Sequence, residues 1–119
     1  LAGLTLAMKN MMGTIGGFRS PMHINFDQKI VDLNTVAKSH LVVLDAYRIL
    51  VRNGPTGGNL ADVEMPKTVV AGSNPVSVDA YGTTFFDMKP SDLEYLVLAN
   101  QQGLGEIDLK KLRIEEISV

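Results

Sequence analysis

Apolar residues recur with helical spacing in the first third of the chain. Residues 4–12 are mostly apolar, and Gly13 after them can terminate a helix. A second helix follows, which Asn25 would cap at its N-terminus. Its predicted core side consists of residues that fall on one helical face: Phe26, Ile30, Leu33 and Val36 or Ala37.

The middle of the chain carries short apolar runs typical of strands. Residues 41–44 are apolar with β-branched members, which predicts a strand buried on both faces, as in a parallel sheet. Residues 47–51 predict a further strand or an extended arm, and residues 68–71 predict the next strand. Residues 112–117 alternate between apolar and polar and predict a final, half-exposed strand.

The last third has well-marked helix ends. Asn74 followed by Pro75 is typical of a helix start, and the helix over residues 76–86 is apolar on most sides. Residues 91–94 form a capping-box pattern for another helix. Gly103 is suited to end that helix, with Leu104 making the hydrophobic contact of a Schellman motif.

This order of elements predicts one α/β domain over residues 1–119, with helices packed on a small mixed, partly parallel sheet. The chain has 119 residues, 45% of them hydrophobic and 20% charged, which is an ordinary globular composition.

Charge and cysteine content exclude several classes of function. The net charge of −2 gives no basic field to attract nucleic acid, and no apolar run reaches the roughly 18 residues of a membrane span. Without cysteine, the chain itself holds no cysteine-ligated iron–sulfur cluster, disulfide or thiol nucleophile. The same absence fits a cytoplasmic location.

Five segments, in order, resemble the domain-of-unknown-function family numbered 362. They are residues 6–13, 44–46, 53–58, 70–80 and 103–106. The resemblance implies the C-terminal part of the family domain, so we expect a fragment of a larger domain; the chain also starts at Leu1 without a methionine. Some family members carry a ferredoxin-type iron–sulfur module, which is not in this sequence.

The glycine-rich residues 53–59 are the first candidate binding surface. Glycine reaches positive φ, so Asn53, Gly54, Gly57 and Gly58 can turn backbone N–H groups toward an anionic ligand. The loop lacks the Lys-Ser/Thr pair of a Walker loop and the spacing of a dinucleotide fingerprint. The alternative is an ordinary surface turn.

Predicted strand ends supply the other candidates. Gly72 and Asn74 lead into a helix start that favours an anion, unless they form a plain strand–helix connection. Asp45 follows a predicted strand, and Asp79 lies in a helix predicted to be buried, where a carboxylate needs partners. Asp79 would bond to backbone N–H groups of the glycine loop, or the two aspartates would hold a divalent metal or move a proton.

A cationic wall is predicted around the first glycine-rich connection. Lys9, Asn10 and Arg19 could converge there on an anion, and His23 could act in acid–base chemistry or as a metal ligand. The alternative for His23 is a surface or capping role.

Two functions remain open from the sequence. The first is a domain that binds a small anionic ligand or a divalent metal at a glycine-rich, aspartate-containing site. Beyond this possible metal, the sequence identifies no cofactor. The second is a non-catalytic accessory module that docks onto a ferredoxin-type redox partner. In the second case, loss of the N-terminal family segment would expose apolar surface and favour a homo-oligomer.

Overall fold

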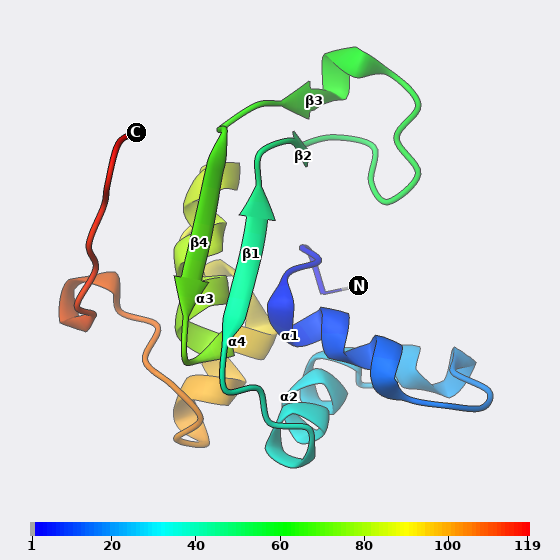
Figure 1. The fold of residues 1–119 in the computed structure, drawn as a ribbon. Helices are drawn as coiled ribbons and strands as arrows, with labels where there is room; N and C mark the ends of the chain where they lie inside the picture. Colours follow the sequence, from blue (N-terminus) through cyan, green and yellow to red (C-terminus); the bar gives the residue numbers. More distant parts are fainter. Residues whose placement is uncertain (1) are drawn as a thin grey trace.

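The computed structural model describes residues 2–119, and Figure 1 shows helices gathered behind a narrow sheet. The N-terminal half contains α1 (Ala7–Asn10), the 3-10 turns η1 (Met11–Thr14) and η2 (Ser20–His23), and α2 (Phe26–Val36). The C-terminal half contains α3 (Pro75–Gly82), η4 (Thr83–Phe86), η5 (Pro90–Asp92), α4 (Glu94–Gln101) and η6 (Leu109–Lys111).

The strands between these halves form one long, bent hairpin. β1 (Val42–Ala46) pairs with β4 (Thr68–Gly72), and β2 (Ile49–Leu50) pairs with β3 (Val63–Glu64), which follows the turn η3 (Leu60–Asp62). Between the two ladders, the Lys67 amide donates to the Tyr47 carbonyl at 3.2 Å. The glycine-rich residues 53–59 therefore lie at the far tip of the hairpin.

The mixed helix-and-sheet fold is confirmed, but the partly parallel sheet is wrong for the described residues. Both strand pairs are antiparallel. A parallel pair needs a crossover of a dozen or more residues, usually through a helix. The chain between β1 and β4 instead forms the β2–β3 hairpin. This hairpin brings β4 back alongside β1 in the opposite direction.

The β1–β4 sheet is covered on one face only. In β1, Val42 and Ala46 are buried toward the helices, whereas Val43 and Asp45 point to the exposed face. The prediction of a strand buried on both faces is therefore wrong, and Asp45 lies within β1 rather than beyond its end. Leu44 faces the helices, because a Cβ added to Gly82 of α3 would lie 3.1 Å from its Cδ2.

The core lies between the helices, on the covered side of the sheet. Its fully buried side chains come from four helices: Met8, Ile30, Val31, Val76, Ala80, Tyr95, Leu96 and Ala99. Asn34 is a buried polar member that the helical pattern missed; its Nδ2 donates to the Met8 carbonyl at 3.0 Å and to the Ile30 carbonyl at 2.8 Å. This amide ties α2 to α1.

Two predicted helix ends are confirmed. The Asn74 Oδ1 accepts from the amides of Val76 and Ser77, with Pro75 at the first helical position of α3. At the end of α4, the Leu104 amide donates to the Ala99 carbonyl and the Gly103 amide to the Asn100 carbonyl. With Gly103 at φ +75°, this is the predicted Schellman motif.

Three local predictions are wrong. Asn25 adopts a left-handed conformation and its side chain caps nothing in α2. The capping box over residues 91–94 does not form, because residues 90–92 make a 3-10 turn and the extended Leu93 precedes α4. Residues 112–117 are not part of a sheet, since β4 hydrogen-bonds only to β1 among the described strands.

Replacing Asn74 tests the strand–helix junction. Asn74→Ala removes the cap of α3 and the bond from Nδ2 to the Leu104 carbonyl, so we expect a loss of about 1–2 kcal/mol in the free energy of unfolding. Urea denaturation measures this loss. Asn59→Ala, which removes the cap of the exposed turn η3, is the matched control and should cost clearly less. Equal losses would contradict this account of the junction.

Candidate functional site

The glycine-rich loop is a tight turn packed on its own hairpin. Asn53, Gly57 and Gly58 have φ angles of 55°, 61° and 115°, and the Gly57 amide donates to the Asn53 carbonyl at 2.9 Å. Leu50 fills the space beneath, so that a Cβ on Gly57 would lie 3.2 Å from its Cδ1. Gly54 precedes a cis peptide bond to Pro55. The positive φ angles of this loop are thus accounted for by the turn and by its packing on Leu50.

Asp62 holds the two ends of this loop together. Its Oδ2 accepts from the Asn53 side chain at 2.8 Å, and its Oδ1 accepts from Arg52 Nε at 3.2 Å. Arg52 also donates to the Ala61 carbonyl. The bond from Asn53 and the neighbouring Arg52 guanidinium lower the pKa of Asp62, against the opposing effect of burial. Asn53 is therefore engaged within the hairpin.

Asp79 is fully buried and binds the N-terminus of α1. Its Oδ1 accepts from the Ala7 amide at 2.7 Å, and its Oδ2 accepts from the Met8 amide and from the Tyr95 hydroxyl, both at 3.0 Å. The predicted need for partners is met, but by α1 and α4 rather than by the glycine loop. Burial nevertheless raises the pKa of Asp79 to about 6.

Asp45 and Asp79 are not brought together. Asp45 lies on the exposed face of β1, where its Oδ1 accepts from the Tyr47 amide at 2.8 Å. Asp79 belongs to α3, which packs on the covered face of the same sheet. Within residues 2–119, no group of three or more histidine, aspartate or glutamate side chains is arranged to hold a metal ion.

Gly72 and Asn74 form a packed junction at the opposite end of the sheet from Asp45. In the antiparallel register Asp45 pairs with Val69, while Gly72 pairs with Val42. A Cβ on Gly72 would lie 2.8 Å from Val78 Cγ2. The first free amides of α3 are already bonded to Asn74, so this helix start presents little to an anion.

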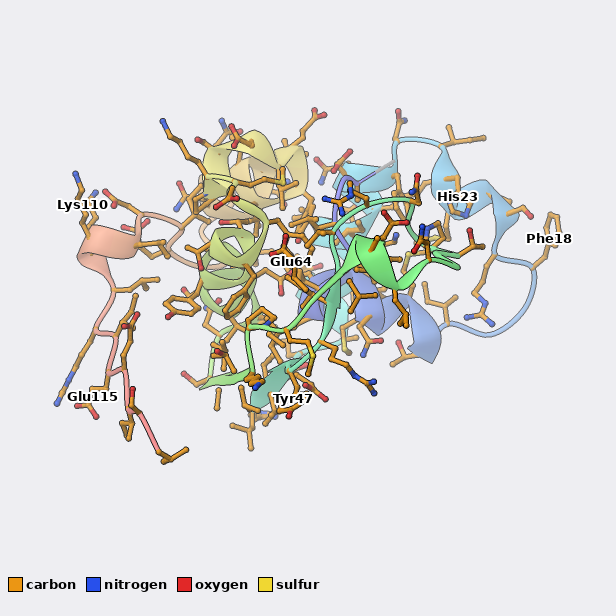
Figure 2. The ribbon with its side chains drawn as sticks, turned by 90° about the horizontal axis from the view of Figure 1, so that it is seen from above. Phe18, His23, Tyr47, Glu64, Lys110 and Glu115 are labelled. Carbon is orange, nitrogen blue, oxygen red and sulfur yellow. The ribbon has the colours of Figure 1, made fainter. Side chains whose placement is uncertain are left out.

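Two residues of the predicted cationic wall approach the ring of Phe26. Lys9 Nζ lies 5.4 Å from the centre of the Phe26 ring, and the His23 ring lies 5.0 Å from the same ring. Arg19 is on the neighbouring loop, with Nη1 3.5 Å from the Met12 carbonyl. Asn10 is exposed at the end of α1. Figure 2 places His23 and Phe18 at one end of the molecule and Lys110 at the other.

The surface that the sequence reasoning missed is the exposed side of the β1–β4 sheet. We call it the outer face; its members alternate along the two strands and are Leu41, Val43, Asp45, Tyr47, Val69 and Ala71. Leu41 is 69% exposed, Val43 62% and Val69 63%. The signal was present, because the strand sequence is apolar at consecutive positions, but it was attributed to burial within a larger sheet.

These features define a small mixed α/β domain in which Asp62 and Asp79 are committed to its own structure. The model of the family described as Domain of unknown function (DUF362) matches residues 1–84, and the chain belongs to this family. The resemblance inferred from short motifs is thus confirmed. The match includes α1 to α3, whereas α4 with Tyr95 lies beyond it. Neither a curated protein nor a solved structure matches the chain.

The helices of the structure can be compared with the prediction that no segment is long and apolar enough to span a membrane. In the part of the chain that the structure describes, no helix combines the length and the apolar character that crossing a membrane requires. The cytoplasmic location stays a prediction.

The buried carboxylate predicts a specific pH dependence. Folding raises the pKa of Asp79 from 3.8 to about 6, so between these values the folded chain retains a proton that the unfolded chain releases. Its effect on stability is absent below about pH 4, grows more unfavourable as the pH rises to about 6, and is then constant at about 3 kcal/mol.

Comparison with Asp79→Asn isolates this effect. The amide has no charge to bury, and its loss of one acceptor for a backbone N–H of α1 costs the same at every pH. We expect the stability of wild type relative to Asp79→Asn to fall as the pH rises from 4 to 6.5 in urea denaturation. Asp79→Ala, which leaves two amides without a partner, should be destabilised at every pH. A constant difference between wild type and Asp79→Asn would contradict the raised pKa.

Proposed function

We propose that the chain is a non-catalytic docking module that binds a partner protein through the outer face of its sheet. The observation that carries this proposal is the exposure of Val43 and Val69 on the same face of two paired strands, together with the exposed Leu41 just before β1. Contiguous exposed apolar patches on otherwise globular domains are typical of protein interfaces. Scattered apolar residues would not carry the same weight.

The outer face also has a polar feature that could orient a partner. Asp45 lies directly opposite Val69, within the apolar surface, and is exposed. A partner with an apolar surface and one basic side chain aimed at Asp45 would match both the shape and the charge of the outer face. A ferredoxin-type partner, which the family resemblance implied, stays a prediction.

A shared aspartate site has less support. Asp79 already accepts three hydrogen bonds, and Asp45 lies across the sheet from it. A divalent metal or a proton-transfer pair at these two residues would require them to meet. The docking function needs no such rearrangement, because its surface is already formed.

Lysine substitutions on the outer face test the proposal with the chain itself and a hydrophobic dye as probes. In the double variant Val43→Lys/Val69→Lys, dye fluorescence and any concentration-dependent self-association should fall. The free energy of unfolding should change by less than about 1 kcal/mol, since both side chains are exposed. Light scattering and dye titration measure these effects.

The matched control is Val36→Lys, at the end of α2, where an exposed valine lies outside the sheet. This variant should behave as wild type. If the double variant binds dye as strongly as wild type and Val36→Lys do, the outer face is not the apolar surface that binds and the docking proposal fails.

A second function, binding of a small anion, is favoured by the grouping around Phe26. Lys9 and His23 both approach this ring, and Arg19 is on the adjoining loop. A phosphate or carboxylate group of a small ligand would find cationic donors beside an aromatic surface there.

Phosphate titration followed by NMR tests this second function. Lys9→Gln should weaken binding of inorganic phosphate by about threefold to tenfold, because it removes a cationic donor. Lys110→Gln, at the opposite end of the molecule, should leave binding unchanged. Equal effects of the two substitutions would indicate non-specific charge attraction.

A further inference from the structure

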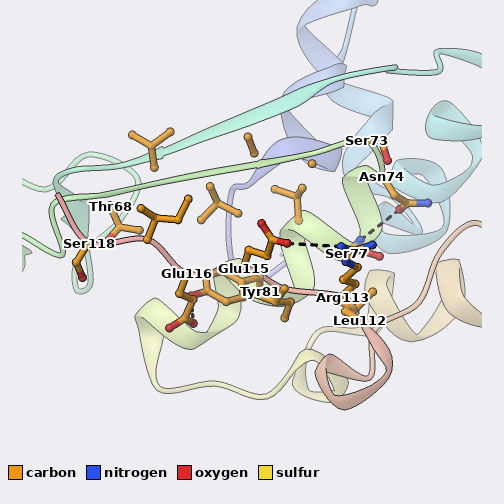
Figure 3. A pocket seen from close by; sticks show the side chains of 17 residues that line it. Thr68, Ser73, Asn74, Ser77, Tyr81, Leu112, Arg113, Glu115, Glu116 and Ser118 are labelled. Carbon is orange, nitrogen blue, oxygen red and sulfur yellow. Dashed lines mark hydrogen bonds and ion pairs between the residues drawn. The ribbon is translucent and has the colours of Figure 1, made fainter.

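A groove runs along the free edge of β4. It has a volume of about 550 Å³, and β4, α3 and residues 112–118 line it. Figure 3 shows Thr68 and Ser118 at one end of the groove, and Asn74, Ser77 and Arg113 at the other. Ser77, Val78 and Tyr81 of α3 form the floor between the two walls.

The first wall is an unprotected strand edge. β4 pairs with β1 on one side, and among the described residues no strand pairs with its other side. Natural edge strands are usually blocked by lysine, proline or a bulge. The sequence of β4, Thr-Val-Val-Ala-Gly, contains no charged residue and no proline. Its outward N–H and C=O groups are therefore open to another strand.

The second wall is an extended segment that belongs to no sheet. Leu112 has φ −87° and ψ 142°, and the residues after it are in neither helix nor strand. Tyr81 ties this segment to α3, because its hydroxyl donates to Glu116 Oε1 at 2.7 Å. The residue pairs at the groove ends show that it runs antiparallel to β4.

Together the walls bound a groove that is as long as a strand. A strand that pairs with β4 would lie about 4.8 Å from it, on the side of the groove. The groove extends along the whole of β4, from Thr68 to Gly72. An inserted segment of about this length could hydrogen-bond to β4 along one edge and to residues 112–118 along the other. Without it, neither wall has a strand partner on the side of the groove.

We propose that this groove binds an extended peptide segment of a partner protein, which adds to the sheet as a strand between β4 and residues 112–118. The side chains on one side of the peptide would be apolar, since they meet Val78 and Tyr81. The charged residues of the groove are Arg113, Glu115 and Glu116, and Arg113 is 3.7 Å from Glu115. The remaining negative charge selects a basic residue in the peptide.

This site is independent of the outer face. The outer face presents side chains perpendicular to the sheet, whereas the groove presents the backbone edge of β4 in the plane of the sheet. Substitutions that block one surface leave the other intact.

A short synthetic peptide tests the proposal. The probe is a fluorescein-labelled heptapeptide in which valine and threonine alternate between lysines at both ends. We expect it to bind the full chain in fluorescence anisotropy with a Kd below about 1 mM. The same peptide with its valine amides N-methylated keeps every side chain but loses one edge of donors. It should bind at least about tenfold more weakly.

Charge reversal gives the matched control on the protein. Glu115→Lys, which keeps the Tyr81–Glu116 bond and makes the net charge of the groove positive, should favour a peptide with glutamate ends over the lysine peptide, whereas Glu64→Lys, on β3 outside the groove, should leave the original preference unchanged. Hydrogen exchange should show new protection of amides in β4 and in residues 113–117 when the peptide is bound.

Three results would overturn the proposal. The first is no peptide binding up to about 1 mM, and the second is equal binding of the N-methylated peptide. The third is protection of the β4 amides without peptide in a chain that light scattering shows to be dimeric, because the occupant would then be a second copy.

Discussion

The packing of this domain depends on one buried carboxylate. Asp79, in α3, accepts the amides of Ala7 and Met8 at the start of α1 and the hydroxyl of Tyr95 in α4. Four-residue helices such as α1 have no stability of their own, and its own N-cap, Leu6, supplies no side-chain bond. Asp79 provides the missing acceptor from more than 70 residues away in the sequence, and so fixes where three helices meet. The three donors that surround it offset only part of the cost of burying its charge, and the pKa of Asp79 stays raised.

A second constraint is the direction of the hairpin that carries β1 and β4. Because the two strands are antiparallel, their C-terminal ends lie at opposite ends of the sheet. Candidate site residues near the C-terminal ends of the two strands are therefore separated in space, as Asp45 and Gly72 are. Helices cover only one face of the sheet, which leaves the outer face exposed, and among the described residues no second strand pairs with β4. The interaction surfaces proposed for this domain follow from that incomplete covering.

Local signals in the sequence were reliable wherever the physics was local. Asn74 with Pro75 marked a helix start, and Gly103 with Leu104 marked a helix end, because capping bonds join residues only a few positions apart. The helical pattern of Phe26 and Ile30 likewise identified the buried side of α2. The alternation in residues 112–117 predicted a strand that lacks a partner in this structure, since a strand is defined by pairing and not by its own sequence. The family was also identified from short motifs alone, and the family model matches residues 1–84 of the chain.

The sequence by itself determined the mixed α/β character, the positions of the main helices and of β1 and β4, and the burial of Asp79. Only the tertiary structure decided which groups Asp79 bonds, because its partners at Ala7, Met8 and Tyr95 come from distant segments. It also decided that Asp62, which no pattern had singled out, holds the glycine loop through Asn53 and Arg52. The antiparallel pairing of the strands and the exposure of Val43 and Val69 were likewise decided only by the tertiary structure. Hydrophobicity states that a residue tends to be covered, whereas the arrangement of the whole chain decides whether anything covers it.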